Sequence, residues 1–335
     1  MPMMELAARL LYVAASGFAR LPWPWLRTLA DGIARLWQRT DARMGKVVAC
    51  NLALAYPEQL PGQRVALHAG VLHGTARQAL ETLRMWTRPH AQNLAAIRQS
   101  QGVDLFDAAI ASGRGVIVAA PHYGNWELLN QWLAAHTPLA ILYAPPDSAI
   151  GEAFLNRVRA NAAEPGRVTQ VRAEGPAIRQ LIKRLKDGGV VGILPDQQPK
   201  LGDGEFAPFF GRPALTMTLL PRLAQRTGAV VLFAYCERIG ELPDGGGPAF
   251  ALRFEPAPDA IADADPKVGV AALNAAVERI ARRDPRQYQW TYKRWSIPPP
   301  PGTLGNPYWP DCYPRRLQRR VEHADPSLAG SEHDA

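Results

Sequence analysis

Residues 115–129, GVIVAAPHYGNWELL, carry the pattern that decides the fold. The stretch opens with a short apolar run, Gly115–Ala120, which is consistent with a β-strand buried on both faces. Glu127–His136 follows, with its apolar residues at helical spacing. A buried strand that leads directly into a helix is the repeating unit of α/β proteins.

The alternation of strand and helix continues toward the C-terminus. We predict further strands at Leu139–Tyr143, Val190–Leu194, Val230–Tyr235 and Ala251–Phe254. We predict further helices at Gly151–Ala163, Pro176–Lys186, Ala214–Thr227 and Pro266–Arg283. Together these patterns predict an α/β fold with a mostly parallel central sheet flanked by helices.

The composition of the N-terminal region differs from that of the α/β part. Its longest apolar stretch, Leu10–Ala19, is shorter than the roughly 18–20 apolar residues of a membrane-spanning helix. Trp23 and Trp25 follow beside this apolar segment, and Trp37 comes later among Arg27, Arg35 and Arg39, as in helices that lie at a membrane surface. We therefore expect attachment to one face of an anionic membrane, or a single N-terminal anchor. An amphipathic helix pair packed on the domain is the alternative.

Three domains are predicted on this basis. Residues 1–45 form the membrane-associating helical segment, 46–296 the α/β catalytic domain, and 297–335 a proline-rich and then basic, polar tail.

The composition excludes several classes of protein. The 335 residues carry a net charge of +8, which suits an anionic membrane, an acidic protein or nucleic acid. No nucleic-acid-binding motif accompanies this charge, so we do not expect nucleic acid as a partner. The three scattered cysteines argue against a disulfide framework and a structural zinc site, and neither a metal site nor a nucleotide-binding motif stands out.

The chemistry is expected in the turn after the first strand. His122 lies at the carboxyl end of that strand, the edge where open α/β sheets bind ligands, and Glu127 follows in the first helical turn. His122 is predicted to act as general base on a substrate hydroxyl, with Glu127 orienting its ring and stabilising the imidazolium. A histidine that only caps the helix is the alternative for so short a pattern.

The segment His122-Tyr123-Gly124-Asn125-Trp126-Glu127 resembles the His-x-Gly-Asn-Trp-Glu motif of the bacterial lipid A biosynthesis acyltransferases. Further blocks that resemble this family follow its order along roughly residues 43–296. They are Asn51-Leu52 with Tyr56-Pro57, Glu81, Leu194-Pro195-Asp196-Gln197, Phe209–Thr216, and Pro285–Trp290 with Tyr292–Trp295.

The resemblance implies a reaction and its partners. Members move a fatty acyl chain from acyl carrier protein to a hydroxyl of a lipid A precursor, at the cytoplasmic face of the inner membrane. Such a transfer needs a base for the alcohol, which His122 supplies, but no serine or cysteine nucleophile and no cofactor. The motif does not determine which lipid accepts the acyl chain. Another glycolipid, a phosphatidylinositol mannoside, or an ornithine- or aryl-polyene-type lipid is therefore an alternative acceptor. A scaffold without activity is disfavoured because His122 and Glu127 are both present.

Several other residues are candidates for substrate binding. The list comprises Asn125 of the motif, Arg157 or Arg159 for a phosphate, Asp196 for shaping the acceptor site or positioning an arginine, Phe209, Phe210 and Gly211 for the acyl channel, and Lys293 and Arg294 for acidic headgroups or carrier protein. Each also has a structural interpretation: a solvated helix face for the cations, a helix cap for Asp196, and core packing for the phenylalanines.

Overall fold

The computed structural model describes residues 3–40, 42–143, 148–160, 167–172, 175–300 and 305–314. Its centre is a seven-stranded sheet in the order β1-β9-β8-β2-β5-β3-β4. The strands are β1 (Ile97–Gln101), β2 (Val116–Ala119), β3 (Leu139–Tyr143), β4 (Val168–Arg172), β5 (Val190–Ile193), β8 (Val230–Glu241) and β9 (Pro248–Pro256). Every neighbouring pair is parallel except β8 and β9, which confirms the predicted mostly parallel sheet.

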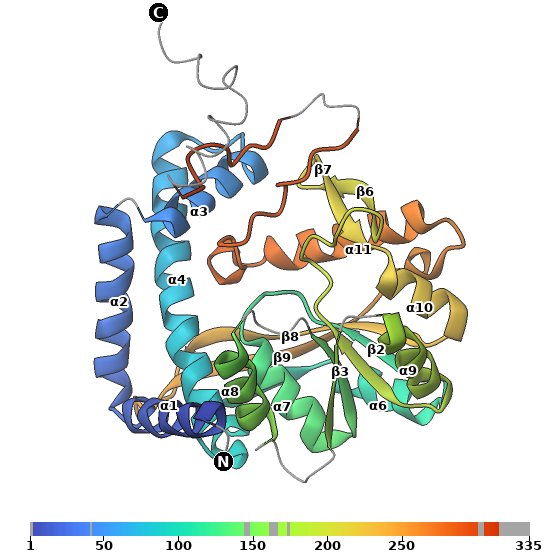
Figure 1. Ribbon diagram of the computed structural model, residues 1–335, viewed down its shortest axis with the longest axis horizontal. Helices are drawn as coiled ribbons and strands as arrows, with labels where there is room; N and C mark the ends of the chain where they lie inside the picture. Colours follow the sequence, from blue (N-terminus) through green and yellow to red (C-terminus); the bar gives the residue numbers. More distant parts are fainter. Residues whose placement is uncertain are drawn as a thin grey trace, which may run out of the picture.

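Helices cover both faces of the sheet (Figure 1). They are α5 (His90–Leu94), α6 (Val103–Ala111), α7 (Trp126–His136), α8 (Ala149–Ala160), α9 (Gly175–Lys186), α10 (Leu219–Thr227) and α11 (Pro266–Ala281). The side chains of β2 alternate between the two layers, as the pleat requires. Val116 and Val118 belong to the core with α6 and α7, whereas Ile117 and Ala119 belong to the core with α9, α10 and α11.

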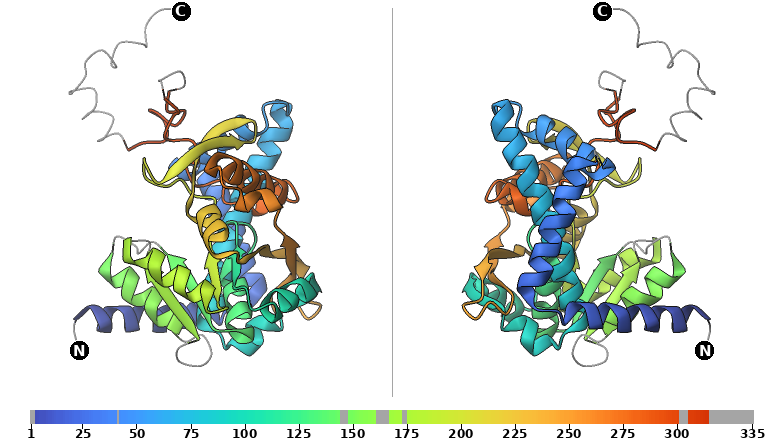
Figure 2. Two further views of the ribbon diagram at one scale, coloured as in Figure 1. Left: turned by 90° about the vertical axis from the view of Figure 1, so that its right-hand side faces the viewer. Right: turned by 90° about the vertical axis from the view of Figure 1, so that its left-hand side faces the viewer.

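Four N-terminal helices precede the sheet: α1 (Met3–Ala19), α2 (Trp23–Arg39), α3 (Arg43–Ala55) and α4 (Pro61–Thr87). Figures 1 and 2 show α2 running along α4, while α1 lies beside α8. Among the described residues, no helix combines the length and apolar character needed to cross a membrane.

Helix α4 also packs against Pro285–Gln287, the start of the last sequence block that resembles the family. A Cβ atom on Gly74 of α4 would lie 2.2 Å from the carbonyl oxygen of Arg286, so only glycine allows this close approach. The short 3-10 turn η2 (Pro285–Gln287) is thereby pressed against α4. A second such turn, η1 (Asp259–Ala262), precedes α11.

The predicted helix Ala214–Thr227 is wrong in its first part. Arg212–Met217 forms β7, which pairs antiparallel with β6 (Gly204–Phe209), and α10 begins only at Leu219. The two-residue connection, Phe210 and Gly211, has φ of 50° and 70°. Positive φ at both central residues is the geometry of a tight hairpin turn, which sets the pairing of the two strands. The edge strands β1 and β4 were also not predicted, and residues 161–163 of the predicted helix after β3 lie outside the described residues.

Candidate active site

The turn between β2 and α7 is held from three sides. Gly124 has a φ of 62°, and a Cβ atom there would lie 2.1 Å from the carbonyl oxygen of Cys236. The Gly124 amide donates to the carbonyl of Gln287 at 3.1 Å, and the Asn125 amide donates to the carbonyl of Cys236 at 2.8 Å. The side chain of Gln78 on α4 donates to the Gly124 carbonyl at 2.8 Å. Glycine is therefore required both for the backbone angle and for the packing against β8.

A buried ion pair lies behind this turn. Glu81 of α4 is fully buried, and its carboxylate accepts hydrogen bonds at 2.5 and 2.8 Å from the guanidinium of Arg238 on β8. The backbone amide of Arg238 donates in turn to the side chain of Gln287, at 2.8 Å. The glutamate that matches the family pattern thus ties α4 to the strand and the segment that support the turn.

His122 is held by a carboxylate from the neighbouring strand. Its Nδ1 lies 2.7 Å from Oδ1 of Asp196, and its backbone amide donates to Oδ2 of the same residue at 2.9 Å. Asp196 follows β5, which pairs directly with β2. Both residues are buried, with 9% of His122 and 4% of Asp196 exposed. The two carboxylate oxygens therefore fix both the backbone and the ring of His122.

The charge of Asp196 sets the tautomer of His122. Burial opposes ionisation of the carboxyl group, but the positive charge and the hydrogen bonds of His122 outweigh it, so the pKa of Asp196 is lowered. An ionised carboxylate only accepts hydrogen bonds, so Nδ1 of His122 carries a proton, and in the neutral ring Nε2 presents the lone pair. The amide Nε2 of Gln197 lies 3.2 Å from that nitrogen. A neutral imidazole in this tautomer can take a proton at Nε2.

A small cavity adjoins the pair. It is lined by Asn51, Asp196, Gln197, Tyr288, Gln289, Trp290, Tyr292 and Arg294. Asn51 holds this wall together, because its amide donates to the carbonyls of Trp290 and Tyr292 at 2.6 and 2.8 Å. Burial, together with the negative charge of Asp196, raises the pKa of Tyr288 well above its ordinary value, so its hydroxyl stays protonated.

Glu127 lies in the first turn of α7, with 5% of its surface exposed. It lines a second small cavity, on the face of the sheet that carries α7 and α8. The contact to Nδ1 of His122 that the sequence assigned to Glu127 is made by Asp196. The catalytic role of Glu127 stays a prediction.

The remaining residues of the predicted site are distributed between the turn and the core. Asn125 caps α7, since its side-chain oxygen accepts from the amide of Leu128 at 2.9 Å. Phe209 and Phe210 are buried in an aromatic cluster with Tyr56 and Trp290. Gly211 completes the hairpin turn described above. These positions correspond to the packing interpretation of the phenylalanines.

The predicted cations occupy different environments. Arg294 is 3% exposed, and its guanidinium donates to the carbonyl of Leu215 at 2.6 Å and to the hydroxyl of Thr216. It therefore braces β7 from inside the molecule. The ammonium of Lys293 lies 3.1 Å from the ring centroid of Tyr313. Arg157 is exposed on α8, and the side chain of Arg159 lies outside the described residues.

Sequence reasoning missed that Asp196 pairs with His122. The available signal was that both residues follow predicted strands, because the carboxyl ends of parallel strands meet at one edge of a sheet. The missing information was the strand order, since β5 is separated from β2 by some 70 residues of chain but lies beside it. The position of Gln197 beside Nε2 of His122 follows from the same strand order, because Gln197 comes directly after Asp196.

A neutral imidazole whose Nδ1 proton is held by a buried carboxylate, at the carboxyl edge of an α/β sheet, is typical of enzymes that remove a proton from a hydroxyl group. The particular family is given by comparison with known proteins. Residues 5–296 match the model of the bacterial lipid A biosynthesis acyltransferases, and the chain belongs to this family.

Named relatives agree with this assignment. The chain is similar to the lipid A biosynthesis lauroyltransferase of Escherichia coli (strain K12), with 26% identity over 84% of this chain and 88% of the relative. The palmitoleoyltransferase of lipid A biosynthesis from the same organism is 25% identical over 84% of this chain and 88% of its own length. A phosphatidylinositol mannoside acyltransferase of Mycobacterium tuberculosis (strain CDC 1551 / Oshkosh) is 28% identical over 49% of this chain and 52% of its own length. The predicted resemblance is confirmed, and the family supports an enzyme of acyl transfer in lipid A biosynthesis.

Proposed function

We propose that the protein transfers a fatty acyl chain from acyl carrier protein to a hydroxyl of a lipid A precursor, with His122 as general base. The observation that carries the proposal is the 2.7 Å contact between Nδ1 of His122 and Asp196, which leaves Nε2 as the basic nitrogen. Membership of the lipid A acyltransferase family supports the reaction class.

The transfer proceeds by direct attack of the acceptor. Nε2 of His122 takes the proton of the acceptor hydroxyl while its oxygen attacks the thioester carbonyl carbon. The tetrahedral intermediate then expels the thiolate as the carbon–sulfur bond breaks, and the imidazolium returns the proton to sulfur. Asp196 stabilises the imidazolium between the two steps. We retain Glu127 as the second carboxylate that favours the positive ring. The scheme needs no cofactor.

The acceptor hydroxyl takes the place of the Gln197 amide at Nε2. Gln197 is also 3.2 Å from the side-chain oxygen of Gln289, so it has a second partner when it leaves the ring. The side-chain amide of Gln197 then remains in this cavity as a hydrogen-bond donor suited to the oxyanion of the intermediate.

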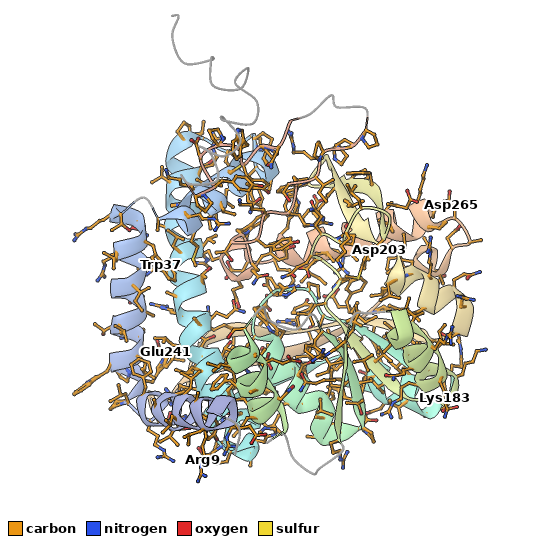
Figure 3. All side chains as sticks on the ribbon, viewed as in Figure 1. Arg9, Trp37, Lys183, Asp203, Glu241 and Asp265 are labelled. Carbon is orange, nitrogen blue, oxygen red and sulfur yellow. The ribbon has the colours of Figure 1, made fainter. Side chains whose placement is uncertain are left out.

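Attachment to the inner membrane is part of the proposal. Leu6, Leu10 and Val13 lie exposed at helical spacing on α1, and Trp25, Leu29 and Leu36 do so on α2. Trp25 is 68% exposed, and both helices lie at the edge of the molecule (Figures 1 and 2). Apolar stripes with arginines beside them suit the boundary between acyl chains and anionic headgroups. The basic residue Lys183 on α9 lies on the opposite side of the molecule from Trp37 of α2 (Figure 3).

The test is mass spectrometry of lipid A from cells with and without the gene. Loss of one secondary acyl mass is expected on deletion, and the mass difference gives the chain length. The wild-type gene should restore the species, whereas His122→Ala should not, and Glu127→Ala should restore only traces. Lys183→Ala is the control that should behave as wild type.

Two outcomes would contradict the proposal. Restoration by folded His122→Ala at near-normal level would remove the base from the mechanism. Unchanged lipid A after deletion would instead point to another acceptor, for which the mycobacterial phosphatidylinositol mannoside acyltransferase among the relatives gives a specific candidate. The whole lipid extract should therefore be examined in the same experiment.

A further inference from the structure

Arg294 is a buried cation whose hydrogen bonds in the described part of the chain all go to neutral groups. It is 3% exposed, and its Nη1 donates to the carbonyl of Leu215 at 2.6 Å. Its Nη2 donates to the hydroxyl of Thr216 and lies 3.4 Å from Oδ1 of Asn274. Burying a charge is costly unless an opposite charge accompanies it. The immediate neighbours of Arg294 therefore leave its positive charge uncompensated.

Arg238 shows the more usual arrangement. Its guanidinium is bound directly by the carboxylate of Glu81, so the two charges cancel. For Arg294, the carboxylate lies across the small cavity: Asp196 lines that cavity with it and is hydrogen-bonded to His122. Nε of Arg294 is buried without a partner among the described residues. A water molecule in the cavity can accept from this atom, but it brings no charge.

The cavity places Arg294 close to the catalytic ring. Asp196 and Gln197, the two side chains that lie against the ring nitrogens of His122, both line it together with Arg294. Because the cavity is small, and Asp196 and Arg294 are both buried, little water screens one charge from the other. Burial lowers the pKa of Arg294, and Tyr288 and Asp196 oppose that lowering. The cation and the carboxylate therefore act on each other across the cavity.

The other titratable groups near the ring do not add charge to this cavity. Tyr288 and Tyr292 line it, and burial raises the pKa of each, so both hydroxyls stay neutral. Glu127 on α7 lines the other cavity, on the face of the sheet that carries α7 and α8. Among the residues that line the cavity beside the catalytic ring, Asp196 and Arg294 carry the charges.

These two charges have opposite effects on His122. A carboxylate at Nδ1 favours the imidazolium, whereas a nearby cation disfavours it. A ring that is already protonated at both nitrogens cannot act as a base. Asp196 alone would set the correct tautomer but would also favour the inactive, charged ring. A cation across the cavity limits that second effect.

We propose that Arg294 is a positioning residue for the base: its buried positive charge keeps His122 neutral in the resting enzyme, while Asp196 keeps the proton on Nδ1. The inference rests on the proposed function, in which His122 accepts the proton of the acceptor hydroxyl. A residue that only braces β7 would affect stability but not the pH at which the base works. The pH profile therefore separates the two roles of Arg294.

The experiment measures kcat/KM against pH for the full-length protein in detergent micelles. The donors are lauroyl-, myristoyl- and palmitoyl-acyl carrier protein, and the acceptor is a lipid A precursor. Arg294→Gln removes the charge but keeps a hydrogen-bond donor, whereas Arg294→Lys keeps the charge. Asn274→Asp leaves Arg294 in place and sets a carboxylate beside its guanidinium, so it cancels the charge even if Arg294→Gln does not fold.

Arg84→Gln is the matched control. Arg84 of α4 is 2% exposed, and its guanidinium also donates to a backbone carbonyl, that of Gly246, at 2.9 Å. It does not line the cavity beside His122. Its variant removes a buried positive charge of the same kind from a place where the inference assigns it no effect on the base.

In Arg294→Gln and Asn274→Asp, the acid limb of kcat/KM should move to higher pH, because the ring stays protonated longer once the cation is removed or cancelled. A shift of about one pH unit is expected, the order of magnitude for one charge that acts across a small buried space. Transfer should thus be about tenfold below wild type on the acid limb and approach wild type on the alkaline side. Arg294→Lys and Arg84→Gln should keep the acid limb of wild type, whatever stability they lose.

Three results would overturn the inference. An acid limb at the wild-type position in Arg294→Gln and Asn274→Asp would show that Arg294 only braces β7. An equal shift in Arg294→Lys would show that the effect does not come from the charge. An equal shift in Arg84→Gln would show that it does not come from this cavity. No transfer by wild type from any of the donors, at any pH, would instead refute the proposed function itself.

Discussion

The surroundings of His122 and of Glu127 differ in how far the polar atoms beside these two residues are paired. Around His122, both ring nitrogens and the backbone amide have named neighbours in Asp196 and Gln197. Around Glu127, Nε1 of Trp86 and Nδ1 of His90 are buried and have no hydrogen-bond partner among the described residues. In the proposed mechanism, the first region is arranged for proton transfer before any substrate arrives, which is how preorganised sites stabilise developing charge.

Breaking the His122–Asp196 contact should have the largest effect. In Asp196→Asn, the one remaining oxygen is needed by the backbone amide of His122, which leaves the side-chain NH₂ facing Nδ1. That NH₂ donates to Nδ1 and favours the tautomer with the proton on Nε2, where the base must have its lone pair. We expect kcat to fall about 10³- to 10⁴-fold, as in other enzymes that lose the carboxylate behind a catalytic histidine. Steady-state transfer to a lipid A precursor measures this.

Asp31→Asn is the matched control for that variant. Asp31 also pairs with a histidine, His73, and with Arg77, but it lies between α2 and α4. Its variant should retain kcat within a few-fold while losing some stability. Comparable losses of kcat in both variants would mean that the effect of Asp196 is one of folding and not of tautomer control.

Gly124→Ala should give the next largest effect, on stability. The new Cβ atom would meet the Cys236 carbonyl oxygen at 2.1 Å, and the backbone has a φ of 62°. Gly228, at a φ of 67°, has no atom within 4 Å of the corresponding position. Gly228→Ala should therefore cost only the conformational term of about 1–2 kcal/mol, whereas Gly124→Ala should cost more than about 4 kcal/mol, the range of severe substitutions. Urea unfolding of both variants measures the difference, and equal costs would refute the packing argument.

The same regions show why only part of the molecule was predictable. β3 was predicted at its exact bounds, and β2 and α7 within one or two residues, because buried apolar runs and helical spacing are local signals. The second strand of the hairpin, from Ala214 on, was predicted as the start of a helix, because its apolar residues are buried in one core with those of α11 and show no clear alternation. Glycine at the second turn position was the local signal for a hairpin.

The candidate site also has a part that could be predicted from the sequence and a part that could not. His122 and Glu127 were found because their motif is contiguous in sequence. The pairing of His122 with Asp196 depends on which strands are neighbours, and the burial of Arg294 depends on how the last segment folds back onto β7. The unpartnered nitrogens of Trp86 and His90 depend on the packing of helices from distant parts of the chain. Such features are determined by tertiary structure and leave no pattern in a single sequence.

The dependence of stability on pH should give the smallest effect. The pKa of Asp196 is lowered in the folded protein, so its contact with His122 contributes stability that is complete above the ordinary carboxyl value of 3.8 and is lost as the pH falls below it. Glu237 and Asp284 also have lowered pKa values, so their protonation destabilises the folded protein in the same acid range. The contribution of Asp196 is therefore obtained as the difference in unfolding free energy between wild type and Asp196→Asn. That difference should narrow as the pH falls below 3.8. A difference that instead widens there would mean that the buried carboxyl group is neutral in the folded state, and that it donates to His122 and does not accept.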